Sequence, residues 1–129
     1  MITVYVKRQS GFPVNTVRIK KELKIFFTAN GIVSDASVEV AIVGKSKMTE
    51  LAKTFLKEKD TVHNVLSFPA AETQNKFKYP PNSPIDLGEI IVCYPQAAME
   101  ANKEGKLVDD KISELVIHAG YHLLGIHHA

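Results

Sequence analysis

Histidines near the C-terminus have the residue type and spacing of metal ligands. His118 and His122 are four residues apart, so on a helix their side chains project from the same face, one turn apart. Two imidazoles placed in this way can reach one metal ion at about 2.0–2.1 Å each. Gly125 can take the left-handed conformation that ends a helix, after which the chain can turn back toward the first two histidines. The spacing therefore predicts a metal site of His118, His122 and His128, with His127 as the alternative third ligand.

The number of protein ligands indicates what such a site does. Three protein ligands leave a fourth position for water, which is the pattern of catalytic zinc, whereas structural zinc sites are usually closed by four protein ligands. Imidazole also suits copper, nickel and iron, so we expect one Zn²⁺ ion, with another transition metal as the alternative. We expect His118 and His122 beside Leu115 on the apolar side of the helix, where a buried imidazole pair without a partner would be costly.

The hydrophobic pattern predicts the elements that must position these histidines. Apolar, β-branched runs predict four strands, at residues 2–6, 38–43, 62–68 and 87–93. Apolar residues at helical spacing, with capping and breaking residues around them, predict four helices, at about residues 19–31, 46–56, 94–105 and 109–124. In the second of these, we expect Ser46 to be the N-cap and Phe55 to lie on the apolar face. Residues 69–84 contain four prolines and predict a long loop. The order β-α-β-α-β-β-α-α predicts an α+β (mixed α/β) fold with one four-stranded mixed sheet packed with helices.

Composition limits the possible classes of protein. A chain of 129 residues with 45% hydrophobic and 23% charged residues predicts a single domain over residues 1–129. We expect no membrane span and no signal peptide, since no apolar stretch has the length or the flanking residues of either. The single cysteine, Cys93, predicts a small buried residue on a strand and fits a reducing, cytoplasmic location. Residues 1–60 carry 11 Lys/Arg against 6 Asp/Glu, which suits either nucleic acid binding or solvated helix faces.

The histidine spacing H-x-x-x-H-x-x-G-x-x-H also occurs in the metzincin peptidases. Those enzymes have a glutamate general base directly after the first histidine, where this chain has Ala119. They also need a methionine turn after the third histidine, and this sequence ends at Ala129. We therefore expect a reaction other than proteolysis and keep a metzincin-like metallopeptidase as a minor alternative.

The sequence HAGYHLLGIHH resembles the signature of the YbeY family of bacterial endoribonucleases, the rRNA maturation factors, which reads approximately H-G-x-L-H-L-x-G-Y-D-H. Two upstream blocks extend the resemblance. HNVLSFP, at residues 63–69, corresponds to the family's T-D-V-L-S-F-P, and LGEI, at residues 87–90, corresponds to its L-G-D-I. The similarity covers roughly residues 40–128, with the three blocks in the family's order.

The chain departs from the family's pattern at several positions, four of which bear on the activity. Ala119 replaces a glycine, Ile126 a tyrosine and His127 an aspartate. An arginine thought to be important for activity corresponds to Lys57, which keeps the charge but loses the bidentate fork that grips phosphate. We expect these departures to reduce the activity or to change the substrate.

The resemblance implies a metal-dependent, single-strand-specific endoribonuclease that hydrolyses RNA phosphodiesters in rRNA maturation and ribosome quality control. It implies His118, His122 and His128 as ligands of one zinc ion, Lys57 as a catalytic residue, and an rRNA precursor and the ribosome or its proteins as partners. The alternative for Lys57, which its position alone favours, is a solvated lysine at the end of a helix. Ser67 and Asn64 either line the site or serve the end of their strand. The alternatives are a ribosome-associated binding module with a structural metal and an inactive paralogue.

Overall fold

The structure is a computed structural model and describes residues 1–58, 61–70 and 85–125. The elements, in chain order, are β1 (Ile2–Arg8), the 3-10 turn η1 (Gln9–Gly11), α1 (Thr16–Ala29), β2 (Ala36–Val43), α2 (Lys45–Leu51), the π-helical turn η2 (Ala52–Leu56), β3 (Val65–Pro69), β4 (Ile85–Cys93), α4 (Tyr94–Glu104) and α5 (Val108–Leu123). The predicted order of strands and helices is confirmed, and the fold is α+β. None of the described helices is long and apolar enough to cross a membrane.

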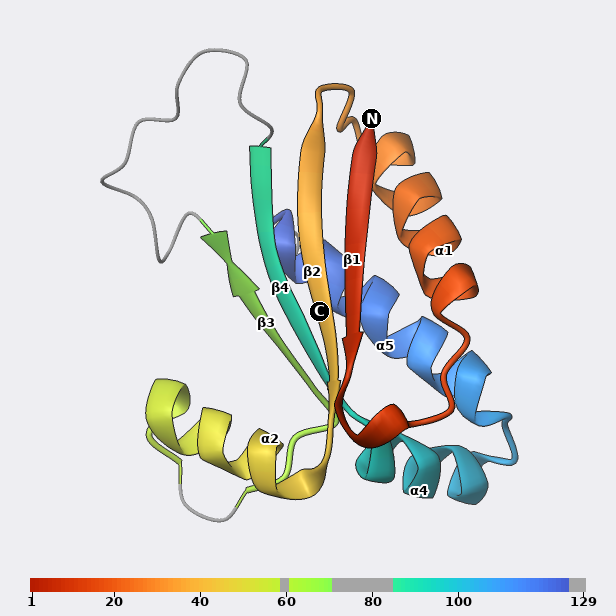
Figure 1. Ribbon diagram of the computed structural model, residues 1–129, viewed down its shortest axis with the longest axis vertical. Coiled ribbons are helices and arrows are strands. Elements are labelled where there is room, and N and C mark those ends of the chain that lie inside the picture. Colours follow the sequence, from red (N-terminus) through yellow and green to blue (C-terminus); the bar gives the residue numbers. More distant parts are fainter. Residues whose placement is uncertain (59–60, 71–84, 126–129) are drawn as a thin grey trace.

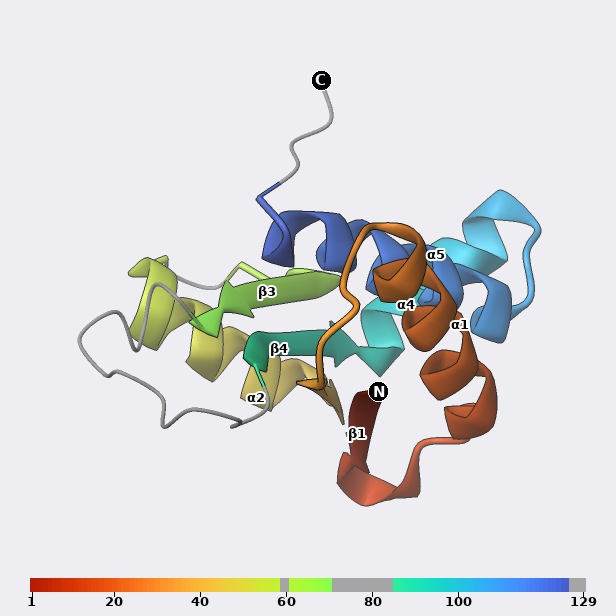
Figure 2. The ribbon, with the colours of Figure 1, turned by 90° about the horizontal axis from the view of Figure 1, so that it is seen from above.

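The four strands form one mixed sheet in the order β1-β2-β4-β3 (Figure 1). β1 pairs with β2, and β2 with β4, in parallel, whereas the edge strand β3 is antiparallel to β4. Helices α1 and α5 cover one face of this sheet, and α2 lies against one end of the other face (Figures 1 and 2). The sheet therefore has one fully covered face and one that is partly open.

The two faces of the sheet belong to two hydrophobic clusters. The larger cluster lies under α1 and α5 and includes Leu23, Phe27, Val40, Ile90 and Val116. The smaller one lies under α2 and consists of Val43, Met48, Leu66, Ile91 and Cys93, with partly buried residues packed against it. Cys93 is fully buried on its strand, as predicted, and burial raises the pKa of its thiol.

A bulge in β4 explains the glycine of the LGEI block. Ser37 pairs with Asp86 and Glu39 with Glu89, so Leu87 and Gly88 together lie opposite the single residue Val38. Gly88 has φ +120°, a conformation that L side chains rarely adopt, and a Cβ there would lie 2.3 Å from the carbonyl oxygen of Phe68. Only glycine fits at this position, which lets β3 approach β4 closely.

Helices α1 and α5 meet at another glycine. A Cβ on Gly120 would lie 2.8 Å from Cε2 of the Phe26 ring. The same ring packs edge-on against Tyr121, with 4.7 Å between ring centroids, and Phe26 is buried. The missing side chain of Gly120 therefore allows α5 to lie directly on Phe26, at the turn of the helix that carries His118 and His122.

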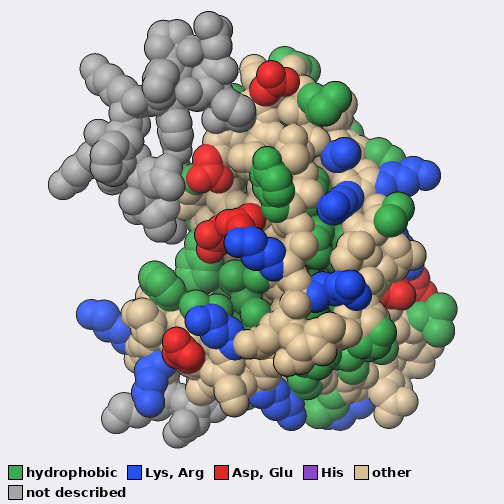
Figure 3. Space-filling view, in the orientation of Figure 1, with side chains coloured by type: hydrophobic (Ala, Val, Ile, Leu, Met, Phe, Trp, Pro, Cys, Tyr) green, Lys and Arg blue, Asp and Glu red, His purple; other side chains and the backbone are tan. Residues whose placement is uncertain are grey.

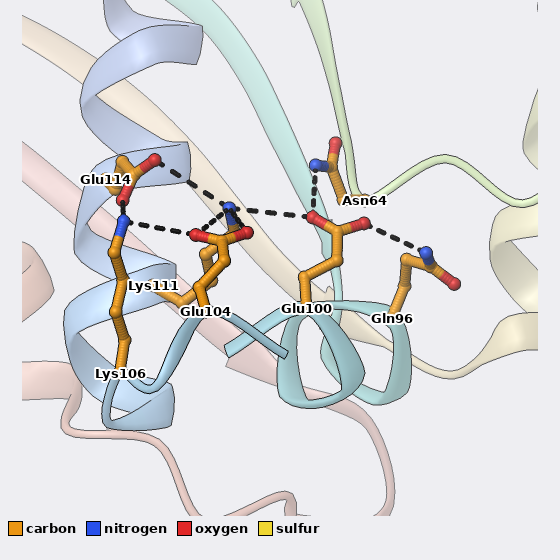
Figure 4. A network of polar contacts seen from close by, with 7 residues as sticks. All are labelled: Asn64, Gln96, Glu100, Glu104, Lys106, Lys111 and Glu114. Atoms are coloured by element: carbon orange, nitrogen blue, oxygen red, sulfur yellow. Dashed lines mark hydrogen bonds and ion pairs between the residues drawn. The ribbon is translucent and has the colours of Figure 1, made fainter. Parts of the chain in front are cut away.

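A network of ion pairs holds the first half of α5 (Figure 4). Lys111 is 6% exposed, and its Nζ lies 2.9 Å from Oε2 of Glu104 and 3.6 Å from Oε1 of Glu100. Glu100 also accepts hydrogen bonds from Asn64, at the start of β3, and from Gln96. The network thus joins α5 to α4, and α4 to the chain that enters β3.

The charges of this network shift the pKa values of its members. The hydrogen bond to Glu104 raises the pKa of Lys111. The hydrogen bonds from Lys111 and Lys106 lower the pKa of Glu104. Burial raises the pKa of Glu100, but the hydrogen bonds from Asn64 and Gln96 and the charge of Lys111 outweigh burial, so this pKa is also lowered. All three shifts favour the charged forms.

Local details differ from the predicted boundaries. Helix α2 begins at Lys45 after Gly44, which makes no side-chain cap, so Ser46 is inside the helix and is not its N-cap. The single predicted helix changes to the π-helical turn η2 at Ala52. Phe55, predicted to lie on its apolar face, is 60% exposed. β3 begins at Val65, three residues later than predicted.

We predict that Gly120→Ala lowers the free energy of unfolding by about 1 kcal/mol. Alanine alone would favour the helix by roughly 1 kcal/mol, but overpacking against the buried Phe26 ring costs about 1–3 kcal/mol. Urea denaturation measures the change. Adding Phe26→Leu to Gly120→Ala should cost less than Phe26→Leu costs in wild type, because the smaller side chain leaves room for the methyl group. A variant more stable than wild type would contradict this packing.

We predict that Lys111→Met lowers the free energy of unfolding by about 2 kcal/mol at pH 7, because the buried charge no longer compensates the glutamates around it. Glu100 and Glu104 have pKa values below the ordinary value of 4.5. Their contribution is therefore present above pH 4.5 and is lost as the pH falls through the lower folded-state values. The difference between variant and wild type should shrink over that range, as measured by denaturation at pH 7 and below pH 4.

Lys103→Met is the matched control for this prediction. Lys103 is exposed in the last turn of α4 and has no ion pair among the described residues. Its replacement should change stability by less than about 0.5 kcal/mol at either pH. Equal losses for the two variants, or a Lys111→Met loss independent of pH, would mean that the network contributes nothing specific.

Candidate metal centre

His118 and His122 lie one turn apart near the end of α5, as the spacing predicts. Their ring centroids are 4.6 Å apart, and the ring planes meet at 60°. The prediction that both are buried beside Leu115 is wrong in part: Leu115 is buried, but His118 is exposed and His122 is half-buried. The buried face of α5 is formed by residues such as Ile112, Leu115, Val116 and Ala119, and the histidines lie at its margin. A pair at the margin is open to solvent and to a ligand.

The end of α5 has the predicted geometry. Leu124 is the C-cap, and Gly125 follows with φ +76°, the left-handed conformation expected at the end of a helix. Ile126, His127 and His128 lie outside the described residues, so the third ligand stays a prediction. In the described ranges, up to Gly125, no group of three or more His, Cys, Asp or Glu residues is arranged to hold a metal ion.

The two described histidines fit a shared ion. Two nitrogens bound to one tetrahedral zinc at about 2.0–2.1 Å lie about 3.3 Å apart. Rings with centroids 4.6 Å apart and non-parallel planes can place two nitrogens at such a separation. The donor set, neutral imidazole at a solvent-accessible margin, suits zinc and other borderline transition metals. The described part of the chain therefore has two side chains that would suit a tetrahedral site.

Ser67, from the HNVLSFP block, contacts this histidine pair. Its Oγ lies 3.4 Å from Nδ1 of His122, across 55 residues of sequence. Asn64, from the same block, instead hydrogen-bonds to Glu100 of α4, and its carbonyl accepts a hydrogen bond from the Cys93 amide. Of the two readings that the sequence allowed, Ser67 lines the site and Asn64 anchors the start of its strand.

Lys57 is the C-cap of η2 and has φ +56°, in the left-handed region. It is exposed and takes part in no ion pair with another described residue. Two residues before Lys57, Phe55 of η2 packs on Phe68 of β3, with ring centroids 5.3 Å apart. η2 therefore ends beside the edge strand. This arrangement leaves the ammonium group of Lys57 accessible to an anion. Its catalytic role stays a prediction.

A contact between His63 and Glu58 was not anticipated from the sequence. His63 Nε2 lies 2.5 Å from Glu58 Oε2, between η2 and β3. The five-residue separation falls in irregular chain, where no helical or strand period indicates which side chains meet. The family's block has a threonine where this chain has His63, which was the one available signal.

Glu89, the carboxylate of the LGEI block, lies on the partly open face of the sheet. Lys7 and Glu39 line the same hollow, and Lys7 Nζ lies 2.8 Å from Glu39 Oε1. Figure 3 shows acidic and basic side chains next to each other over this face. Burial raises the pKa of Glu89, and the negative charge of Glu39 raises it further. α5 packs on the opposite face (Figure 2), so Glu89 is not part of the histidine site.

Comparison with known proteins finds matches to one protein family. A family model described as endoribonuclease YbeY matches residues 7–129. The endoribonuclease YbeY of Stutzerimonas stutzeri is 36% identical over 94 residues, which are 73% of this chain and 55% of that protein. The one from Dehalococcoides mccartyi strain BAV1 is 30% identical over 134 residues, covering 98% of this chain and 83% of that protein.

The matched length differs among these relatives. The match spans 64% of the endoribonuclease YbeY of Phytoplasma australiense and 55% of the Stutzerimonas stutzeri protein. The chain therefore covers between half and two thirds of the length of these relatives. A solution structure of a Thermotoga maritima protein superposes with a TM-score of 0.57 at 24% identity, covering 100% of this chain and 75% of that one. That likeness supports the α+β fold. From the family model and the identity to its relatives, the chain belongs to the YbeY endoribonuclease family.

Proposed function

We propose that this chain is a metal-dependent endoribonuclease that hydrolyses phosphodiester bonds of single-stranded RNA. The observation that carries the proposal is the pair His118 and His122, side by side at the solvent-exposed margin of α5 in a member of this family. With His128 as the third ligand, they would hold one zinc ion. When bound, such an ion supplies a water of lowered pKa and a Lewis acid for a phosphoryl oxygen.

The residues of the chain have distinct tasks in this proposal. His118, His122 and His128 would hold the ion through neutral imidazoles. Lys57, exposed at the end of η2, binds a phosphate of the RNA backbone. Because lysine is a point charge without the fork of arginine, it neutralises the phosphate but orients it less strictly. The excess of lysine and arginine in residues 1–60 adds a general attraction for RNA.

The resemblance to the YbeY family also suggests where the reaction takes place. We propose that the substrate is an rRNA precursor, that the chain acts with the ribosome or its proteins in maturation and quality control, and that it works in the cytoplasm. The support is membership of the family, together with a buried, reduced cysteine that fits a reducing compartment.

We predict that His122→Ala abolishes zinc binding and RNA cleavage but keeps the fold, because the clusters on both faces of the sheet supply a core without a metal. Zinc content, cleavage of a labelled single-stranded RNA, and thermal melting with and without chelator measure the three properties. His63→Ala is the matched control, since His63 is paired with Glu58, and it should keep its zinc. A chelator that collapses the wild-type melting transition would instead indicate a structural metal.

We predict that the logarithm of the RNA affinity falls linearly with the logarithm of the salt concentration, because phosphate contacts release counterions. The slope of this line reflects the number of phosphate contacts. Lys57→Ala should reduce the slope by about one, and Lys57→Arg should restore it. Lys103→Ala, an exposed lysine on α4, is the control and should leave the slope unchanged. Filter binding of a non-cleaved RNA analogue at several salt concentrations gives the slopes. An unaltered slope in Lys57→Ala would remove Lys57 from the RNA contact.

A further inference from the structure

Ser67 is a polar residue in an apolar position. Along β3, Leu66 and Phe68 pack with the cluster under α2, whereas Val65 packs with the cluster under α1 and α5. Ser67 alternates with them and so faces α5, and its partner across the ladder is the fully buried Ile90. A branched apolar residue would suit this position better than a hydroxyl, which needs a hydrogen-bond partner when it is taken out of water.

The partner that the structure gives to Ser67 is His122. The hydroxyl oxygen lies 3.4 Å from Nδ1, and both residues are half-buried. A neutral imidazole carries its proton on one ring nitrogen and has a lone pair on the other. A hydroxyl can donate to Nδ1 or accept from it; when it accepts from Nδ1–H, the lone pair stays on Nε2, where an ion can bind. In that arrangement the contact holds one tautomer and one ring orientation.

We propose that Ser67 is a positioning residue for the metal centre: its Oγ accepts a hydrogen bond from Nδ1–H of His122, so that Nε2 is the atom that binds the ion. This inference rests on the proposed function, in which His122 is a ligand. Hydrogen bonds to the outer nitrogen of a ligating histidine fix its tautomer and orientation, and their loss usually weakens metal binding about 10–100-fold.

Packing of the fold holds both partners in place. Gly88 in the bulge of β4 lets β3 lie close, with Pro69 opposite it, and Ser67 is two residues away. On the other side, Phe26 contacts Gly120, two residues before His122. The distance between Ser67 and His122 is thus set by packing on both sides, so the pair is preorganised for the ion.

The test compares Ser67→Ala with Ser67→Thr, which keeps a hydroxyl at the same position. Zinc affinity is measured by competition with a chromophoric chelator, and melting of the metal-free proteins checks the fold. We expect Ser67→Ala to bind zinc at least tenfold more weakly than wild type, and Ser67→Thr to stay within about threefold of wild type. A folded Ser67→Ala protein with wild-type zinc affinity would overturn the proposal.

A second measurement needs no variant. Nitrogen-15 NMR of zinc-loaded wild-type protein shows which ring nitrogen of His122 carries the proton, and we expect Nδ1. A proton on Nε2, with zinc on Nδ1, would overturn the role of Ser67 while leaving the metal centre intact. Wild-type protein that binds no zinc at all would instead refute the proposed metal centre, and the inference with it, so the two failures are distinct.

Discussion

The position of α5 on the sheet is the constraint on which the rest of the site depends. The helix carries both described histidines, and its buried face packs against both α1 and the sheet. Because Gly120 meets the buried Phe26 ring without a side chain between them, the distance between the two helices has little freedom. The packing of the core therefore also fixes the position of a histidine at the margin of this helix, although the histidine itself is open to solvent.

Polar contacts secure the same helix at points where apolar packing is incomplete. Near the start of α5, Arg18 of α1 pairs with Asp110 at 2.8 Å, and Glu22 accepts a hydrogen bond from the Ser113 hydroxyl. On its other side, Lys111 reaches the glutamates of α4. The exposed pairs among these each add little stability, but all of the contacts are directional and fix how the helix is rotated about its axis. Rotation matters here because it decides which way an imidazole ring points.

Much of this arrangement is predictable from the sequence, for physical reasons that also mark the limit of prediction. The spacing of His118 and His122 predicted their neighbourhood, because helical periodicity is a local property. Gly105 and Gly125 end their helices in the left-handed conformation, as expected for glycine after the last turn of a helix. The same period placed Phe55 on a buried face, where it is not, because the π-helical turn changes the angle between successive residues.

Contacts between distant segments, or within irregular chain, could not be predicted from such patterns. Nothing local in the sequence indicates that Asn64 would bond to Glu100, or that Glu58 would reach His63. The exposure of His118 was misjudged for a similar reason: the width of the apolar face of α5 is set by α1 and the sheet, which periodicity does not include. Ser67 could be placed at the end of a strand, but its facing partner depends on the strand order, which only the assembled sheet defines.

The alternation of β3 has a consequence for errors in folding. Ser67 and Phe68 are neighbours that point to opposite faces, so a slip of the strand by one residue would exchange them. The hydroxyl would then enter the cluster under α2, and a phenyl ring would fill the place next to His122. Gly88 opposes such a slip, because the close approach of the Phe68 carbonyl tolerates no side chain at the residue opposite Pro69. Gly88 of the neighbouring strand β4 thus favours the register that places Ser67 next to His122, although it is not itself part of the site.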